Sequence, residues 1–261
     1  MISETMQAWL DTAPQWILNG PEWFENFGYE IFKAFIFDQR YMLYLTGLGN
    51  TLRLTFFALI LGIIIGVVVA LVRVSWDKKS SELQPGIGKS LLWVSNFIAK
   101  IYLTVIRGTP VIVQIFIIFF IIMASSNDKF LAGVVAFGIN SGAYTAEIMR
   151  GGIMSIDNGQ TEAGRSLGFG YVQTMLFIVL PQAVKTVLPT LVNEFITLIK
   201  ETAVIGYVGL MDLTYAGNII IGATYSAVYP LLGVAATYLI LVIFLTWIMG
   251  KIERRLRRNE K

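Results

Sequence analysis

The sequence predicts an all-α membrane protein, and two observations lead to that class. Of its 261 residues, 56% are hydrophobic and only 14% are charged, whereas a soluble domain of this length carries about a quarter charged residues. The apolar residues also form long uncharged blocks at residues 54–72, 108–127 and 214–250. Roughly 20 helical residues cross a hydrocarbon layer about 30 Å thick. Continuous apolar runs, without strand alternation, indicate helices and not a barrel.

We expect about five transmembrane helices. Lys and Arg gather after the first span, at the end of the third and at the C-terminus, and such residues mark cytoplasmic segments. The pattern predicts that the N-terminus lies outside and the C-terminus is cytoplasmic, which requires an odd number of spans. The predicted spans cover about residues 48–74, 98–123 with an interruption at 107–110, 131–149, a stretch that includes 184–205, and 230–249.

Residues 1–40 form a separate, aromatic-rich N-terminal segment that we expect to be external or interfacial. It lacks the basic start and compact apolar core of a cleavable signal peptide, and its aromatic residues suit a membrane–water interface. Two interpretations stay open, a leader with a short surface helix and a partner-binding segment. Its acidic residues are Glu4, Asp11, Glu22, Glu25, Glu30 and Asp38, and its tryptophans are Trp9, Trp16 and Trp23.

Composition excludes several kinds of chemistry. The sequence contains no Cys and no His, so disulfides, Cys/His zinc sites and thiol nucleophiles are not expected. We expect no metal or cofactor on this chain and no nucleic-acid partner. Residues 88–90, Gly-Lys-Ser, imitate the end of a phosphate-binding loop, but Leu83 stands where that loop requires glycine. The chain is therefore not expected to be an ATPase or another enzyme.

The tract at residues 162–181 reads EAGRSLGFGYVQTMLFIVLP and is the most informative part of the chain. Residues 166–184 are uncharged and long enough to span, yet a span here would put its basic neighbours on the wrong side. We therefore expect a cytoplasmic helix that packs on the protein and ends at Pro181. Small, charged and apolar side chains at its start suit a partner's groove. The candidate contact residues are Glu162, Ala163, Gly164, Arg165, Leu167 and Gly168.

This tract resembles the coupling loop of type-I ABC importer membrane subunits. Gly164 stands where that pattern has a second alanine, and we expect it to loosen the helix slightly. The resemblance covers roughly residues 48–258, within a transmembrane domain at 41–258 whose coupling loop is about 157–181. The residues that match at the family's spacing are Glu162, Ala163, Gly168, Ile178, Leu180 and Pro181, and the tracts at 107–110, 141–144 and 193–195 resemble the polar amino-acid branch.

The resemblance implies a permease subunit of an ATP-driven amino-acid importer in a bacterial-type plasma membrane. Such a subunit forms the translocation pathway with a second permease, the same or homologous. Separate ABC ATPase subunits bind ATP and Mg and dock on the coupling helix, and an extracytoplasmic substrate-binding protein delivers the substrate. The alternative is a self-contained, ion-coupled secondary transporter, but the inverted repeats expected of that class are not evident.

Polar side chains inside the predicted spans are candidates for substrate contact, because burying them in lipid is costly. Asn140, Tyr144 and Glu147 fall at i, i+4 and i+7, which places them on one helix face. An amino acid needs acceptors for its ammonium group and donors for its carboxylate. An alternative role for Glu147 is an ion pair with Arg150, and Glu194 has a similar alternative with Lys185 or Lys200. The candidates are Gln114, Asn140, Tyr144, Glu147, Asn193, Glu194 and Thr197.

Overall fold

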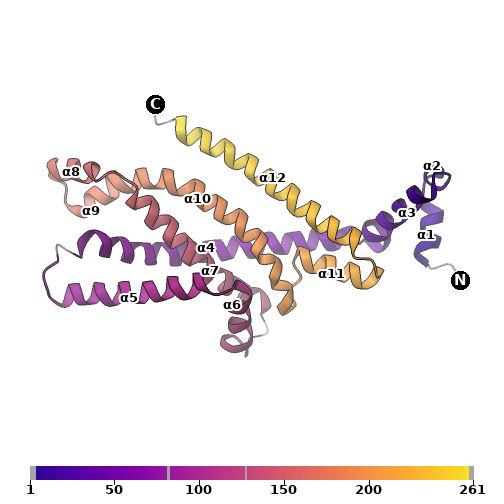
Figure 1. The fold of residues 1–261 in the computed structure, drawn as a ribbon, viewed down its shortest axis with the longest axis horizontal. Helices are drawn as coiled ribbons and strands as arrows, with labels where there is room; N and C mark the ends of the chain where they lie inside the picture. The colour runs from indigo at the N-terminus through magenta and orange to yellow at the C-terminus, as the bar shows by residue number, and fades with distance from the viewer. Residues whose placement is uncertain (1–3, 81–82, 127, 259–261) are drawn as a thin grey trace. The chain divides into compact units, whose positions relative to one another are not determined.

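The computed structural model describes residues 4–80, 83–126 and 128–258, and this part of the chain is helical without a strand (Figure 1). The predicted all-α class is confirmed. In chain order the elements are α1 (Glu4–Thr12), α2 (Gln15–Leu18), α3 (Glu22–Ile31), the π-turn η1 (Phe32–Ile36), the 3-10 turn η2 (Phe37–Gln39), α4 (Tyr41–Lys79), α5 (Ile87–Gly108), α6 (Val111–Ile117), the π-turn η3 (Ile118–Ile122), α7 (Lys129–Met154), α8 (Asn158–Ser166), α9 (Tyr171–Thr174), the π-turn η4 (Met175–Val179), α10 (Leu180–Glu201), the 3-10 helix η5 (Thr202–Val208), α11 (Leu213–Thr224) and α12 (Val228–Arg258).

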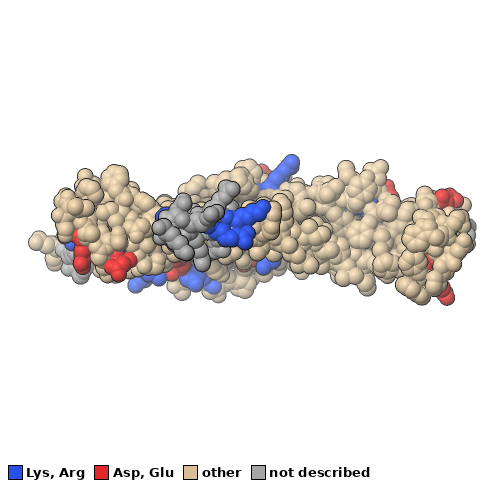
Figure 2. Space-filling view, turned by 90° about the horizontal axis from the view of Figure 1, so that it is seen from above, with Lys and Arg blue, Asp and Glu red and all other residues tan. Residues whose placement is uncertain are grey.

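Four of the five predicted spans each fall within one helical stretch, whereas the second, predicted at 98–123, is divided between α5, α6 and η3. Four helical stretches in the described residues are long and apolar enough to cross a bilayer: Tyr41–Lys79, Ile87–Gly108, Tyr171–Val208 and Val228–Lys251. The remaining predicted span is α7, a helix of 26 residues whose buried positions include many small and polar side chains. The visible face of the molecule in Figure 2 has broad areas without charged residues, as expected for a surface in contact with lipid.

The chain divides into two compact units, and we describe each separately. The first contains Met1–Arg53 and Ala203–Ile243, and the second contains Leu54–Thr202 and Phe244–Lys261. The N-terminal segment is therefore part of the first unit, together with α11 and the start of α12.

In the second unit, α4 and α7 approach each other closely through glycines. A Cβ atom on Gly66 would lie 2.5 Å from Thr145 Cγ2, and one on Gly62 would lie 3.1 Å from Ser141 Cβ. The two glycines are four residues apart on α4, the spacing that allows membrane helices to pack backbone to backbone. On α7, a Cβ atom on Gly138 would in turn lie 2.6 Å from Leu61 Cδ2. This close packing on α4 positions α7, which carries several of the candidate site residues.

The predicted second span is broken, as the sequence indicated. Helix α5 ends at Gly108, and α6 begins at Val111 after Pro110. The Gln114 side chain crosses the break, because its Nε2 donates to the Ile106 carbonyl at 2.8 Å and to the Thr109 carbonyl at 3.1 Å. These bonds satisfy backbone oxygens that the break would otherwise leave without partners.

The second half of the predicted coupling loop, at 171–181, differs from expectation. Residues Tyr171–Val208 form one continuous helical stretch, so Pro181 does not end a helix as predicted. Proline lacks the N–H that an α-helix uses and its ring crowds the preceding turn. The π-turn η4 at Met175–Val179 comes directly before α10, and Pro181 is the second residue of α10. The wider turn and the position of Pro181 at a helix start avoid both conflicts.

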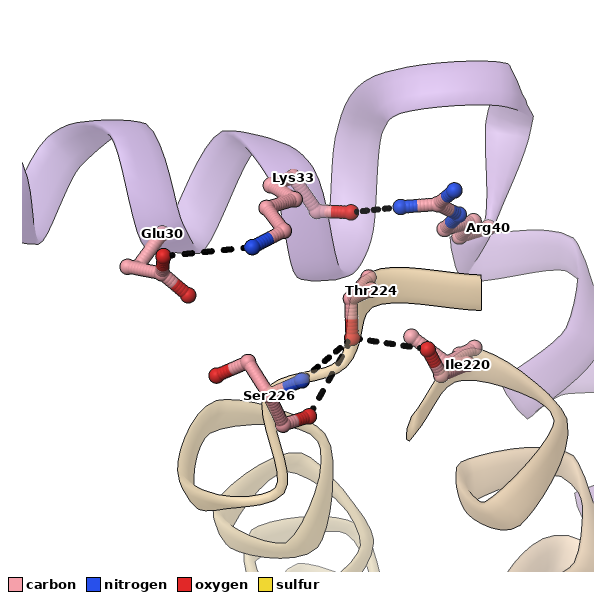
Figure 3. Close-up of polar contacts among 6 residues, drawn as sticks. All are labelled: Glu30, Lys33, Arg40, Ile220, Thr224 and Ser226. Atoms are coloured by element: carbon pink, nitrogen blue, oxygen red, sulfur yellow. Dashed lines mark hydrogen bonds and ion pairs between the residues drawn. The ribbon is translucent and has the colours of Figure 1, made fainter. Parts of the chain in front are cut away.

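In the first unit, Asp212 joins the start of α11 to neighbouring helices. Its Oδ1 accepts from the backbone N–H of Tyr215 at 2.9 Å and its Oδ2 from that of Thr214 at 3.0 Å, which caps α11. The Thr51 hydroxyl of α4 accepts from the Leu213 N–H at 3.1 Å. Polar contacts also hold two turns of the same unit (Figure 3). In the turn before α4, Arg40 donates to the Lys33 carbonyl. In the turn between α11 and α12, Thr224 donates to the Ile220 carbonyl.

Candidate translocation site and coupling helix

The face of α7 that carries Asn140 and Tyr144 contacts α5 and α6. Asn140 Nδ2 donates to Gln114 Oε1 at 3.0 Å, and the Arg107 guanidinium lies 5.6 Å from the centre of the Tyr144 ring. Gln114 and Asn140 are both buried. The predicted shared face is therefore present, but Gln114 and Asn140 use their amide groups on each other and on the break in the second span.

Glu147 lies next to a cavity of about 390 Å³ that also contains three cationic side chains, Arg73, Lys100 and Arg107. Arg150 Nη2 contacts Glu147 Oε2 at 3.1 Å, and Arg150 Nη1 contacts Asp77 Oδ2 at 3.2 Å. The ion pair between Glu147 and Arg150, which the sequence left open as an alternative, is thus present. We call this space the cationic cavity.

The three cations of this cavity are not among the site residues predicted from the sequence. Lys100 and Arg107 are seven residues apart on α5, so they project from one side of a helix that is otherwise apolar enough to span. Such intramembrane cations face a cavity or an opposite charge because lipid cannot solvate them. Their spacing was visible in the sequence, but Arg73 comes from α4 and joins them only through the fold. Its Nη1 donates to Asn96 Oδ1 at 2.6 Å.

Glu194 lies in a different environment. The Ser141 hydroxyl donates to Glu194 Oε1 at 3.2 Å, and this bond connects α7 to α10, which lie side by side (Figure 1). Ser141 is one position beyond Asn140 and therefore about 100° further around α7. Among the described residues Glu194 has no ion pair, so the alternative pairing with Lys185 or Lys200 is not seen. Asn193 and Thr197, also on α10, are exposed.

The predicted coupling helix is α8. Asp157 caps its start by accepting from the Gly159 N–H at 2.6 Å, and its end is closed by a bond from the Phe169 N–H to the Gly164 carbonyl at 3.1 Å. That closure places Gly168 at φ +85°, a left-handed conformation that glycine adopts without strain. The tract thus forms a short, sharply ended helix.

The side chains of α8 divide into a contact surface and a packing position. Glu162, Ala163 and Arg165 are exposed, and Leu167, just after the helix, exposes 75% of its surface. Gly164 is instead buried, and a Cβ atom there would lie 2.7 Å from Thr174 Cγ2 and 2.9 Å from Ile178 Cδ1. The glycine in place of the second alanine therefore allows α8 to pack on the following helix of its own chain.

Comparisons with known proteins agree with this arrangement. Residues 87–258 match the family model described as binding-protein-dependent transport system inner membrane component. The arginine transport system permease protein ArtQ of Bacillus subtilis is 37% identical over 219 residues, which cover 83% of this chain and 93% of that protein. A glutamine transport system permease protein named GlnP, from Rickettsia typhi, is 38% identical over 212 residues, covering 80% of this chain and 90% of that protein.

A solved structure gives the same result at the level of the fold. The crystal structure of an amino acid ABC transporter with histidines contains a chain that superimposes with a TM-score of 0.72 at 37% identity, covering 82% of this chain and 94% of that chain. The family match covers more than half of the sequence, and both curated relatives are matched over most of their length. The chain is therefore a multi-pass inner-membrane protein and belongs to the family of binding-protein-dependent transport system inner membrane components.

Proposed function

We propose that the chain is the permease subunit of an ATP-driven importer of amino acids. The observation that carries this proposal is its similarity to arginine and glutamine permeases over nearly their whole length. In this function the chain forms the pathway, pairs with a second permease of the same or a homologous kind, and receives substrate from an extracytoplasmic binding protein. ATP and Mg belong to separate ATPase subunits. The alternative, a self-contained secondary transporter, is not favoured by the family.

The coupling step is assigned to α8. Leu167 and Phe169 present apolar surface beside the exposed charges of Glu162 and Arg165. An apolar centre with a charged rim is the composition expected of a protein–protein contact. In the proposal the N-terminus is outside and α8 is cytoplasmic, so an ATPase subunit holds α8 and its movement is passed to α10 through the packing of Gly164 against Thr174 and Ile178.

The substrate groups are assigned to the polar residues around α7. The cationic cavity supplies Lys100 and Arg107 for the carboxylate that all amino acids share, and Glu147 lies at the same cavity for the ammonium group. Glu194, with Tyr144, Asn193 and Thr197, is proposed to line the pathway. Gln114 and Asn140 keep a supporting role in this proposal, because their amides are engaged in bonds within the chain.

Uptake of a labelled panel tests the proposal. The chain would be reconstituted with its ATPase and binding protein and offered arginine, glutamine, histidine and, as a control, a neutral sugar. We expect ATP-dependent uptake of at least one amino acid and none of the sugar. Uptake of the sugar alone, with all amino acids excluded, would refute an amino-acid pathway while leaving the family assignment intact.

A further inference from the structure

The last helix, α12, is longer than a bilayer requires. Its apolar part, Val228–Lys251, has 24 residues, which at 1.5 Å per residue is about 36 Å and crosses a hydrocarbon layer about 30 Å thick. The helix then continues to Arg258. Its last two turns, at 251–258, therefore lie at the level of the lipid headgroups, which extend about 5–8 Å on each side of the hydrocarbon.

Four cations of these two turns fall on one side of the helix. They stand at i, i+3, i+4 and i+7, the spacing of a single helix face, and are Lys251, Arg254, Arg255 and Arg258. We call them the basic stripe of α12. Glu253 falls about 200° around the helix from Lys251, on the opposite side.

The basic stripe has no counter-charge within its own helix. No Asp or Glu lies three or four positions before or after any of the four cations, the spacing at which side chains of one helix pair. Lys251 and Arg254 are both exposed, and neither forms an ion pair within the part of the chain that the structure describes. Like charges at this spacing repel one another, so the stripe requires an anionic partner from outside the helix.

The same side of α12 is aromatic and exposed in the turns before the cations. Phe244 and Trp247 stand seven and four positions before Lys251 and expose 54% and 56% of their surfaces. Their rings stack with centres 6.5 Å apart, and the Lys251 ammonium nitrogen lies 3.5 Å from the centre of the Trp247 ring. Tryptophan beside a lysine is typical of the boundary between acyl chains and headgroups.

The opposite side of the helix packs on the protein. Met249, about 200° from Lys251, exposes only 4% of its surface. The side that carries the stripe therefore faces away from this chain. A second copy seated on the stripe about a two-fold axis would bring the same cations toward one another, which like charges disfavour. Lipid avoids this conflict, because acyl chains cover the aromatic rings while a phosphate meets the cations.

We propose that the basic stripe of α12 binds the headgroups of an anionic phospholipid, phosphatidylglycerol, whose acyl chains lie along Phe244 and Trp247. Basic clusters next to a membrane span attract anionic headgroups, and each Lys or Arg near the surface strengthens the association about fivefold. The bound lipid holds the end of α12 at one leaflet. The proposal depends on the membrane location of the chain and is independent of which substrate it carries.

Two lipids that differ only in the headgroup test this proposal. The full chain, labelled with 5-fluorotryptophan, is purified into a lipid-depleted maltoside detergent and titrated with phosphatidylglycerol or with phosphatidylcholine. The ¹⁹F signal of Trp247 is assigned by its absence in Trp247→Phe and gives an apparent affinity for each lipid. We expect this signal to show tighter binding of phosphatidylglycerol. The preference should shrink at roughly 1 M salt, where the Debye length is about 3 Å.

Matched removals of one charge locate the binding. Lys251→Gln and Arg254→Gln should each lower the preference for phosphatidylglycerol at Trp247 by up to about fivefold. The control is Arg257→Gln, which removes the same charge about 120° around the helix from Lys251 and should change the preference much less. The Trp23 signal is an internal control that should show no preference for phosphatidylglycerol, because Trp23 is exposed and lies in the acidic N-terminal segment.

Three results would overturn the proposal. One is equal affinity for the two lipids at Trp247 in the unaltered chain. Another is an equal loss of preference in Lys251→Gln and Arg257→Gln, which would show that only total charge matters. The third is weaker co-purification of the ATPase subunit with Lys251→Gln and Arg254→Gln while the lipid preference is unchanged, which would make that subunit the partner of the basic stripe.

Discussion

At the scale of single residues, buried polar side chains in this protein form hydrogen bonds with backbone groups at helix ends and helix breaks. Gln114 bridges the break between α5 and α6, and Asp212 caps α11. The sequence marked Gln114 as unusual within a span, but its partners are carbonyl groups of Ile106 and Thr109. Backbone partners of this kind depend on where a helix breaks, which residue type alone does not reveal. Asp212 was missed, although an acid before an apolar helix is a recognisable cap signal.

Substitution of Asp212 tests its role as a cap. Asp212→Ala leaves two backbone N–H groups without an acceptor and should lower stability by about 1–3 kcal/mol. Asp212→Asn keeps a side-chain oxygen at the cap and should retain most of the stability. The measurement is thermal unfolding of the purified chain in detergent. Equal losses in the two variants would argue against capping.

The same pair of variants predicts a dependence on pH. Burial raises the pKa of the Asp212 carboxyl above its ordinary value of 3.8, although hydrogen bonds from the Tyr215 and Thr214 amides lower it in part. A carboxyl with a raised pKa contributes stability that is complete below its unfolded pKa and is lost as pH rises through the folded pKa. We would measure the unfolding of both chains from about pH 4 to about pH 8. The stability of Asp212→Asn relative to that of the unaltered chain should increase as pH rises.

At the scale of elements, glycine spacing and helix ends determine how the second unit is assembled. The glycines on α4 and the glycine that ends α8 could be recognised in the sequence, as could the helical periods. The path after α8 was harder to predict. The placement of basic residues and Pro181 suggested a separate helix, but the π-turn η4 carries the chain into α10 without a break. A π-turn follows from tertiary packing and leaves no reliable sequence pattern.

Two glycines of α4 should respond in opposite directions to the same change. A Cβ atom on Gly66 meets Thr145 and Ala146, whereas one on Gly49 meets nothing within 4 Å. Gly66→Ala should therefore destabilise the chain by about 1–3 kcal/mol through overpacking. Gly49→Ala should be neutral or stabilising by up to about 1 kcal/mol, because alanine is the better helix former. Melting curves of both variants in detergent check this, and the same sign for both would contradict close packing of α4 on α7.

The coupling surface can be tested separately from the fold. Leu167→Asp places a charge on an exposed apolar side chain, so the chain itself should keep its melting temperature. Its complex with the ATPase subunit should weaken by about 2 kcal/mol or more, the loss typical of a central apolar contact. Co-purification and ATPase stimulation provide the measurement. The control is Ile87→Asp, on an exposed position of α5 outside the coupling loop. An intact complex in Leu167→Asp, together with a weakened complex in Ile87→Asp, would place the contact elsewhere.

At the scale of the whole molecule, the sequence predicted the fold class, the family and a short helix in the coupling loop, whereas the residues assigned to the pathway stay a prediction. Apolar blocks and spaced motifs depend only on the order of residues along the chain, so they can be recognised without the fold. The cationic cavity combines Arg73 of α4 with Lys100 and Arg107 of α5, and such a set forms only when helices pack.

We propose that this permease is driven by a separate ATPase subunit and has no energy source of its own. The most direct test of this proposal is uptake of labelled arginine and glutamine into liposomes that contain the chain with or without the ATPase subunit, with binding protein supplied on the outside. We predict uptake only when the ATPase and internal ATP are both present, and no uptake by the chain alone under a proton or sodium gradient. Gradient-driven uptake by the chain alone would show that the chain is a self-contained secondary transporter.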